Sequence, residues 1–142
     1  MKILVLTNLY PPHHIGGYEL SCRAVVDTLA TRGHDVHVLT SDHRREHQAW
    51  EPEPNVRRSL KINGFYGHPW LPIWRLVGLE RHNNRVLRDV IAVVRPEVIF
   101  IWAMGGLSKS MLFTVQASGL AAAFYVSDHW IAQGLPIDVW LN

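Results

Sequence analysis

The chain has 142 residues, of which 48% are hydrophobic and 18% charged, and its formal net charge is +2. These values are typical of one globular domain with a sizeable core, and the charge is too small to indicate a nucleic-acid-binding protein. The single cysteine excludes an internal disulfide, and no apolar run approaches the ~20 residues of a membrane span or forms the core of a signal peptide. We therefore expect a cytoplasmic protein.

The N-terminal part of the chain predicts a strand, a helix and a second strand. Residues 3–7 are apolar and partly β-branched, which is typical of a strand buried on both faces. Apolar side chains then recur at helical spacing over residues 18–29, and Gly33 follows as a stop signal. Residues 34–40 predict the second strand. This order is that of a βαβ unit, whose strands are parallel.

Within the first predicted helix, Glu19, Arg23 and Asp27 are spaced at i,i+4 with charges that attract. They predict ion pairs along an exposed face. Cys22 falls on the apolar face, so we expect a core residue rather than a nucleophile.

The middle of the chain is less regular. Residues 41–54 are polar and predict a loop, and residues 56–66 predict a short strand or a hairpin, with Asn63-Gly64 as a turn signal. A helix is expected to begin at residue 73 or 79 and to end at residue 94.

The last third returns to alternating strands and helices. We expect a strand at 97–102, a helix at 107–117 and a strand at 121–126. The whole pattern predicts an α/β protein with a Rossmann-like, doubly wound, mostly parallel sheet. Ligands bind such sheets beyond the carboxyl ends of the strands, where three loops are expected to meet: 8–17, 103–107 and 127–134.

The first of these loops contains Gly16-Gly17, directly before a helix. Glycines at a helix start let a ligand approach the backbone, and the amides and dipole there favour a phosphate. The spacing fits neither the dinucleotide fingerprint nor the P-loop. A tight turn that needs glycine is the alternative.

The same loop carries two histidines, His13 and His14, behind a proline pair. A histidine in a cleft hydrogen-bonds a hydroxyl, moves a proton or binds metal. Taken alone, a solvated loop histidine is the commoner case.

Ser127, Asp128, His129 and Trp130 follow the last predicted strand. A carboxylate beside an imidazole suits sugar binding or acid–base chemistry, and the indole offers a flat face for a sugar ring. A turn with Asp128 as a helix cap is the alternative, but the position at a strand end favours a functional site.

Two further patterns carry less weight. Residues 43–47 read H-x-x-E-H, but they lie in a polar loop rather than on a helix, so we expect no metal.

Residues 70–88 combine tryptophans with Arg75, Arg81, Arg85 and Arg88. They suit either the solvated face of a helix, which we favour, or a peripheral contact with anionic lipid at the inner face of a membrane.

Residues 2–41, KILVLTNLYPPHHIGGYELSCRAVVDTLATRGHDVHVLTS, resemble the start of the family-four retaining glycosyltransferases of the GT-B fold. The shared features are a strand, a Y-P-P-x-x-G-G loop, a helix and R-G-H-x-V-x-V-L-T. The segment RPEVIFIW and the strand before SDHW extend the resemblance over most of the chain.

The resemblance implies two Rossmann-like domains facing across a cleft. The N-terminal domain binds mainly the acceptor, and the C-terminal domain binds mainly a nucleotide diphosphate sugar. Gly16 and Gly17 would then lie near the donor diphosphate, His13 and His14 would face the acceptor or sugar, and no other cofactor is implied. Asp128 and His129 would be catalytic, and Ser127 and Trp130 would contact sugar.

The chain departs from the family in two respects. Ser127-Asp128 stands where many relatives have His-Asp, and the C-terminal domain with its E-x7-E motif is missing. We therefore expect residues 1–142 to be an incomplete N-terminal domain, inactive alone, that acts on a lipid-linked or polymeric saccharide. The alternative is a non-catalytic Rossmann-type module that binds a phosphate-bearing ligand.

Overall fold

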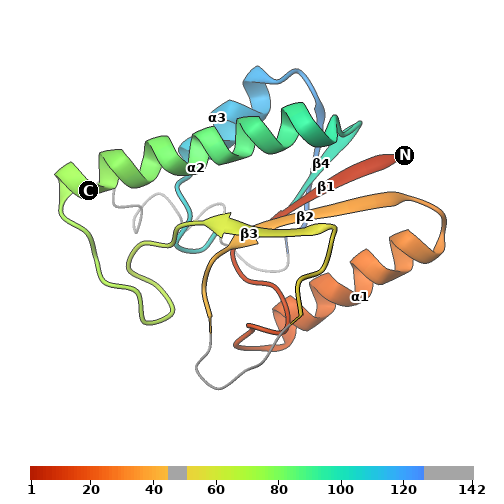
Figure 1. Cartoon of the computed structure of the whole chain (residues 1–142), viewed down its shortest axis with the longest axis horizontal. Coiled ribbons are helices and arrows are strands. Elements are labelled where there is room, and N and C mark those ends of the chain that lie inside the picture. The colour runs from red at the N-terminus through yellow and green to blue at the C-terminus, as the bar shows by residue number, and fades with distance from the viewer. Residues whose placement is uncertain (45–50, 127–142) are drawn as a thin grey trace.

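Five parallel strands and three helices make up the described part of the chain, residues 1–44 and 51–126, in the computed structural model (Figure 1). Along the chain they are β1 (Lys2–Thr7), α1 (Gly17–Thr31), β2 (Asp35–Ser41), β3 (Val56–Leu60), α2 (Ile73–Val94), β4 (Val98–Ala103), α3 (Ser110–Ala117) and β5 (Ala121–Phe124).

The strands lie in the order β3-β2-β1-β4-β5, and every neighbouring pair is parallel. This is the order of a Rossmann-like doubly wound sheet, so the predicted fold class is confirmed. The chain runs outward from β1 through β2 to β3 and then crosses back to β4 on the other side of β1. The switch in direction lies between β1 and β4, and in such folds this point marks the ligand crevice.

The hairpin alternative for residues 56–66 is wrong, because β3 pairs in parallel with β2. The Asn63-Gly64 turn signal is nevertheless real, since Gly64 has φ +69. Its amide donates to the Pro69 carbonyl at 3.2 Å. The turn therefore folds a loop over the end of the sheet instead of starting a returning strand.

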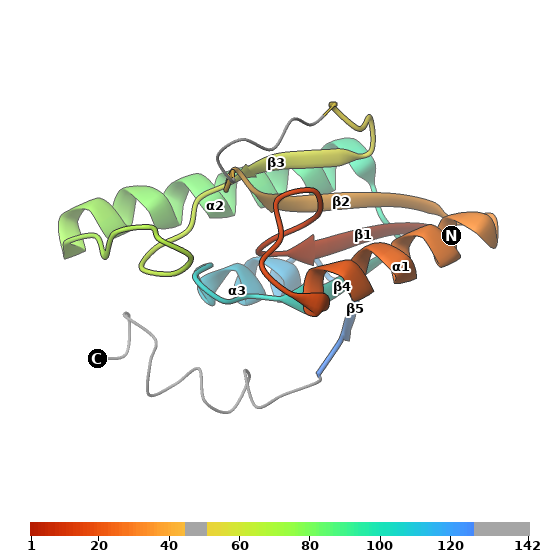
Figure 2. The same cartoon turned by 90° about the horizontal axis from the view of Figure 1, so that it is seen from below.

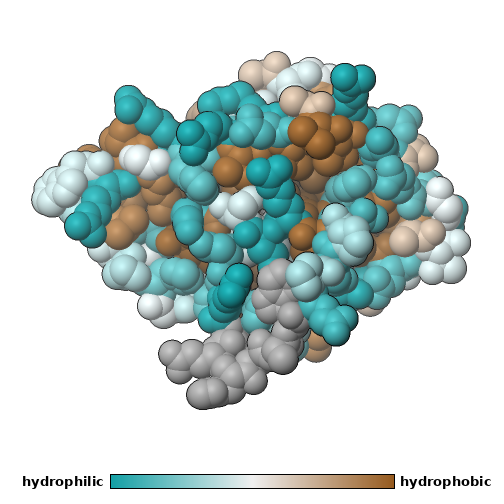
Figure 3. All heavy atoms as spheres, in the orientation of Figure 1, coloured by the Kyte–Doolittle hydropathy of each residue, from teal (hydrophilic) through white to brown (hydrophobic). Residues whose placement is uncertain are grey.

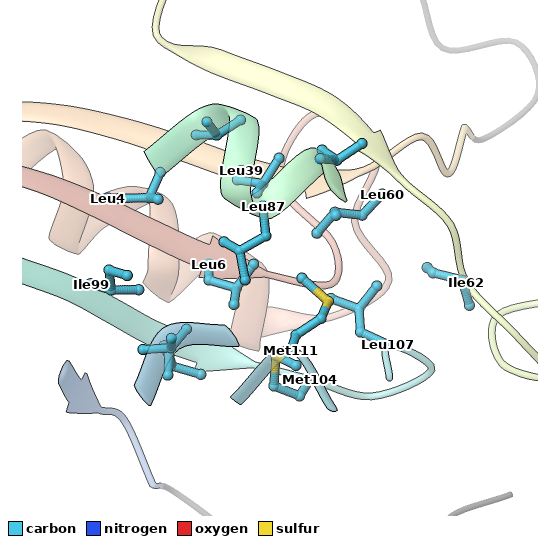
Figure 4. Close-up of a cluster of buried hydrophobic side chains, with 14 of the residues drawn as sticks. Leu4, Leu6, Leu39, Leu60, Ile62, Leu87, Ile99, Met104, Leu107 and Met111 are labelled. Carbon is cyan, nitrogen blue, oxygen red and sulfur yellow. The ribbon is translucent and has the colours of Figure 1, made fainter. Parts of the chain in front are cut away.

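The helices cover both faces of the sheet, with α1 on one face and α2 and α3 on the other (Figures 1 and 2). Alternate side chains of β1 show why: Leu4 and Leu6 face α2 and α3, and Ile3 and Val5 face α1. Figure 4 shows the larger cluster, in which Leu87 and Met111 pack on the strands.

The predicted row of ion pairs along helix α1 is only partly present. Arg23 Nε donates to Asp27 at 3.1 Å, as expected. Glu19, however, is buried and accepts a hydrogen bond from the Gly16 amide at 2.9 Å, so it caps the helix start instead of pairing with Arg23. Cys22 is a core residue as predicted, and its burial raises the pKa of the thiol to about 12.

Candidate functional site

The candidate site lies at the carboxyl ends of β1 and β4, the edge at which Rossmann-like sheets bind their ligands, and we call this edge the crevice. Its centre is Asn8, which follows β1 directly and is 2% exposed. The Asn8 amide nitrogen donates to the Gly105 carbonyl at 3.0 Å and to the Tyr66 hydroxyl at 2.7 Å. One side chain thus joins the loop after β1, the loop after β4 and the segment between β3 and α2.

The backbone of Asn8 fixes a further strand end. Its carbonyl accepts hydrogen bonds from the Thr40 hydroxyl at 3.2 Å and from both the amide and the hydroxyl of Ser41. Its side-chain oxygen accepts the Leu9 amide at 2.8 Å. A buried amide with these bonds is costly to replace, so a substitution at Asn8 is expected to destabilise the end of the sheet.

Arg58 on β3 holds the loop after β1 from the side. Its guanidinium donates to the carbonyls of Tyr10 and Pro11, and lies 5.7 Å from the centre of the Tyr10 ring. Glu53 is 3.9 Å from the same guanidinium. Burial lowers the pKa of Arg58 and raises that of the Tyr10 hydroxyl. The first loop is therefore a preformed wall, with a cis peptide bond at Pro11-Pro12.

His13 and His14 lie in this wall and differ in exposure. His13 is 1% exposed, and its burial, with the charges of Arg58 and Arg44, lowers its pKa, so the ring is neutral at neutral pH. His14 is half-buried, and its Nδ1 lies 2.9 Å from the Pro12 carbonyl. His14 is thus the one that a ligand in the crevice reaches more easily.

Gly16 is the N-cap of α1, a position that tolerates glycine well, and neither Gly16 nor Gly17 is required by close packing. Gly16 has an extended backbone with φ −143, and Gly17 is the first helical residue. A Cβ atom built on either glycine meets nothing within 4 Å. The tight-turn alternative requires a positive φ or a close contact at the glycines, and the structure shows neither.

The capping carboxylate limits which amides face outward. Glu19 Oε2 accepts the Gly16 amide at 2.9 Å and the Ile15 amide at 3.3 Å. An anion at this helix start would use the later amides of the first turn, next to a carboxylate. The Glu19 carboxylate repels an anion at this position, so an anion would bind here only if positive charge from elsewhere offset that repulsion.

The segment between β3 and α2 roofs the crevice. The Asn63 amide donates to the Gly106 carbonyl at 3.0 Å, and a Cβ on Gly106 would lie 2.7 Å from Ile62. A Cβ on Gly105 would lie 2.9 Å from the Tyr66 hydroxyl. The pair Gly105-Gly106 is therefore needed for close packing of this roof on the loop after β4.

A second pair of histidines joins the roof to the end of β2, and the sequence does not predict this contact. His43, just after β2, has its Nδ1 3.0 Å from Nε2 of His68. The Tyr66 ring is 6.3 Å from the His43 ring. Two histidines separated by 25 residues form no local motif, so only the fold brings them together.

Other predicted residues lie outside the described part of the chain. Ser127, Asp128, His129 and Trp130 belong to residues 127–142, and most of the H-x-x-E-H pattern belongs to residues 45–50. Within residues 1–44 and 51–126, no group of three or more His, Cys, Asp or Glu side chains is placed to hold a metal ion. No helix in these ranges has the length and apolar character to cross a bilayer.

Two curated proteins are distant relatives of the chain. One is an uncharacterised 42.6 kDa protein of the cps region in Klebsiella pneumoniae, 26% identical over 121 residues. The other is named as an uncharacterised glycosyltransferase of Methanocaldococcus jannaschii, 27% identical over 99 residues. The alignments cover 76% and 70% of this chain but only 31% and 24% of those proteins. No protein-family model matches the chain.

Proposed function

We propose that this chain is the acceptor-side domain of a retaining glycosyltransferase of the GT-B type. The complete enzyme would transfer a sugar from a nucleotide diphosphate sugar to a lipid-linked or polymeric saccharide of the cell envelope. Support comes from the distant similarity to a protein named as a glycosyltransferase and from the Rossmann-like sheet. A second domain would bind most of the donor, as the resemblance implies.

The observation that carries the proposal is the glycine pair at the start of α1. Neither glycine has a close internal contact or a positive φ, and they lie where the loop after β1 meets α1, with Gly16 as the N-cap and Gly17 as the first helical residue. We infer that the space beside them accommodates the donor diphosphate. The first-turn amides would stabilise the charge that develops on the leaving diphosphate, together with basic groups of the other domain.

The remaining residues have roles consistent with this placement. His14 would contact the acceptor or the transferred sugar, while buried His13 would support the loop from below. Asp128 and His129 would act as the catalytic pair, and Ser127 and Trp130 would bind sugar, because β5 ends beside β4 shortly before them. No metal or further cofactor has a role in this scheme.

The test is a calorimetric titration of the chain with UDP, GDP and their sugar conjugates. We expect weak diphosphate binding that Gly16→Val abolishes, since valine tolerates the extended backbone and fills the proposed ligand space. Gly78→Val is the matched control, because the surroundings of Gly78 on α2 are equally open. Equal binding by wild type and Gly16→Val would contradict the assignment.

A sugar-transfer assay on the complete gene product distinguishes the two classes of function. Transfer from a nucleotide diphosphate sugar to a saccharide supports the enzyme. Diphosphate binding without any transfer would favour the non-catalytic module instead.

A further inference from the structure

The surface at the start of α2 has an unusual content of exposed apolar side chains. Trp70, Ile73, Trp74 and Val77 are 57%, 68%, 74% and 39% exposed. We call these four residues the α2 tip. Figure 3 shows apolar spheres beside hydrophilic ones over the end of the molecule where α2 begins. Two neighbouring exposed tryptophans are costly on a surface that meets only water.

The exposed face of α2 continues from the tip as a row of cations. Trp74, Arg81, Arg85 and Arg88 recur at spacings of seven, four and three residues, so they share one face of the helix. We call the three arginines the arginine row. Leu76, Leu87 and Val90 lie on the opposite face and are buried against the sheet.

The arginine row is available for an external partner. Of the ion pairs in the described ranges, none involves Arg81, Arg85 or Arg88. All three side chains are exposed, and the helix carries four arginines against only Glu80 and Asp89. The face is therefore positively charged and complements an anionic surface.

The α2 tip is fixed in place relative to the crevice. The Trp70 ring lies 5.6 Å from the Phe65 ring, and a Cβ on Gly64 would overlap the Trp70 indole at 2.2 Å. The backbone N–H of Asn63 donates to the Gly106 carbonyl in the crevice. The side-chain oxygen of Asn63 accepts a hydrogen bond from the Leu71 backbone N–H at 2.8 Å. The tip thus projects from the same edge of the sheet as the crevice, held by side-chain packing and backbone hydrogen bonds.

We propose that the α2 tip and the arginine row dock this protein on the surface of an anionic phospholipid bilayer. Tryptophan is suited to the headgroup region because its ring is apolar and its N–H is polar. Arginines beside an amphipathic helix add electrostatic attraction to anionic headgroups. Bilayer docking itself does not depend on the proposed function. Its consequence does: the crevice would face a membrane-borne acceptor.

The experiment is co-sedimentation of the protein with vesicles of phosphatidylcholine alone or mixed equally with phosphatidylglycerol. We expect binding to the mixed vesicles that weakens with added salt, and little binding to phosphatidylcholine. Trp74→Ser is expected to weaken binding about tenfold, because a large apolar side chain no longer leaves water. The double variant Arg81→Glu and Arg85→Glu is expected to weaken binding by more than about thirtyfold, because losing each of the two cations costs about fivefold and the new carboxylates repel the anionic headgroups.

Matched controls lie on other surfaces. Phe113 on α3 is 72% exposed, and Arg32 and Arg57 are exposed outside α2, so Phe113→Ser and the pair Arg32→Glu and Arg57→Glu test apolarity and charge in general. Circular dichroism shows whether each variant is folded.

Several results would overturn the proposal. These are absence of binding to mixed vesicles, equal loss in the control variants, or variants of the α2 tip that change self-association but not vesicle binding. The nucleotide titration is independent of these results, so failure of bilayer docking and failure of the proposed function are distinguishable.

Discussion

Tyr18 and Trp102 hold each other by two reciprocal hydrogen bonds. The Tyr18 hydroxyl donates to the Trp102 carbonyl at 3.1 Å, and the Trp102 indole N–H donates to the Tyr18 carbonyl at 3.2 Å. Tyr125 stacks on the same indole with ring centres 3.9 Å apart. The first turn of α1 is therefore locked to the carboxyl end of β4, which positions the glycine pair at the crevice.

Tyr18→Phe tests this lock. Loss of the hydroxyl is expected to lower the free energy of unfolding by about 0.5–1.5 kcal/mol, because the Trp102 carbonyl loses its partner. Urea denaturation measures the change. Ser21→Ala is the control, since it removes an exposed hydroxyl on the same helix and is expected to change stability by no more than about 0.5 kcal/mol. A loss in Ser21→Ala as large as that in Tyr18→Phe would argue against the lock.

Gly17→Ala separates a structural role from a binding role. Alanine favours the helix and restricts the unfolded chain, and its Cβ meets no atom here, so stability is expected to rise by about 0.4–1 kcal/mol. Nucleotide diphosphate binding is expected to fall because the methyl group enters the proposed ligand space. Thermal unfolding and calorimetric titration give the two values. A stabilised variant that binds as tightly as wild type would rule out a steric role for Gly17 in binding.

Glu19→Gln tests the capping carboxylate. Glutamine keeps an acceptor for the Gly16 amide but removes a negative charge from the helix start. We expect a modest loss of stability, about 0.5 kcal/mol, with tighter diphosphate binding. Glu19→Ala removes the acceptor as well and is expected to cost about 1 kcal/mol or more. Weaker diphosphate binding in a folded Glu19→Gln variant would place the anion elsewhere.

Asn8→Ala is expected to destabilise the protein more than any of the substitutions in α1. It removes the hydrogen bonds that the Asn8 side chain makes with the Gly105 carbonyl, the Tyr66 hydroxyl and the Leu9 amide, at a cost of about 2–4 kcal/mol. Hydrogen exchange provides a local measurement, because the amides after β4 should lose protection together with those after β1. If only one of the loops is affected, Asn8 does not join them.

His13 gives the stability of the fold a pH dependence. Its pKa is lowered in the folded state, mainly by burial, so the unfolded state binds more protons once the pH falls below the unfolded value of 6.5. The free energy of unfolding is therefore expected to decrease from about pH 7 toward pH 5 and to level off below the folded pKa. His13→Gln should reduce this slope in denaturation curves measured across the range. An unchanged slope would assign the effect to other groups.

The positions of the helices and strands can be predicted from this sequence better than the contacts between them. Helix α2 ends at Val94, and β2 and β4 lie within a residue or two of their expected bounds, because hydrophobic periodicity and stop signals are local. The pattern predicts that helix α3 begins at residue 107, but it begins at Ser110, since the Gly105-Gly106 turn extends further than the pattern indicates.

The sequence predicts where on the sheet the crevice lies, but not which residues hold it together. The loops after β1 and β4 are expected to meet, and they do. Asn8 is not identified from the sequence as the residue that joins them, because its partners lie 58 and 97 residues away. Arg58 reads as an ordinary strand residue, and its role depends on the fold of the first loop. No periodicity encodes such contacts.

Asn83 limits which substitutions the chain tolerates. Its side-chain amide accepts the Lys61 amide at 2.8 Å and donates to the Lys61 carbonyl at 2.9 Å, so it pairs with the backbone just past β3 as a peptide group would. Nothing in this pairing depends on the side chain at position 61. The pairing with Asn83 therefore places no demand on the side chain at position 61, which instead forms an ion pair with Asp42, whereas position 83 has to keep a primary amide of the same length.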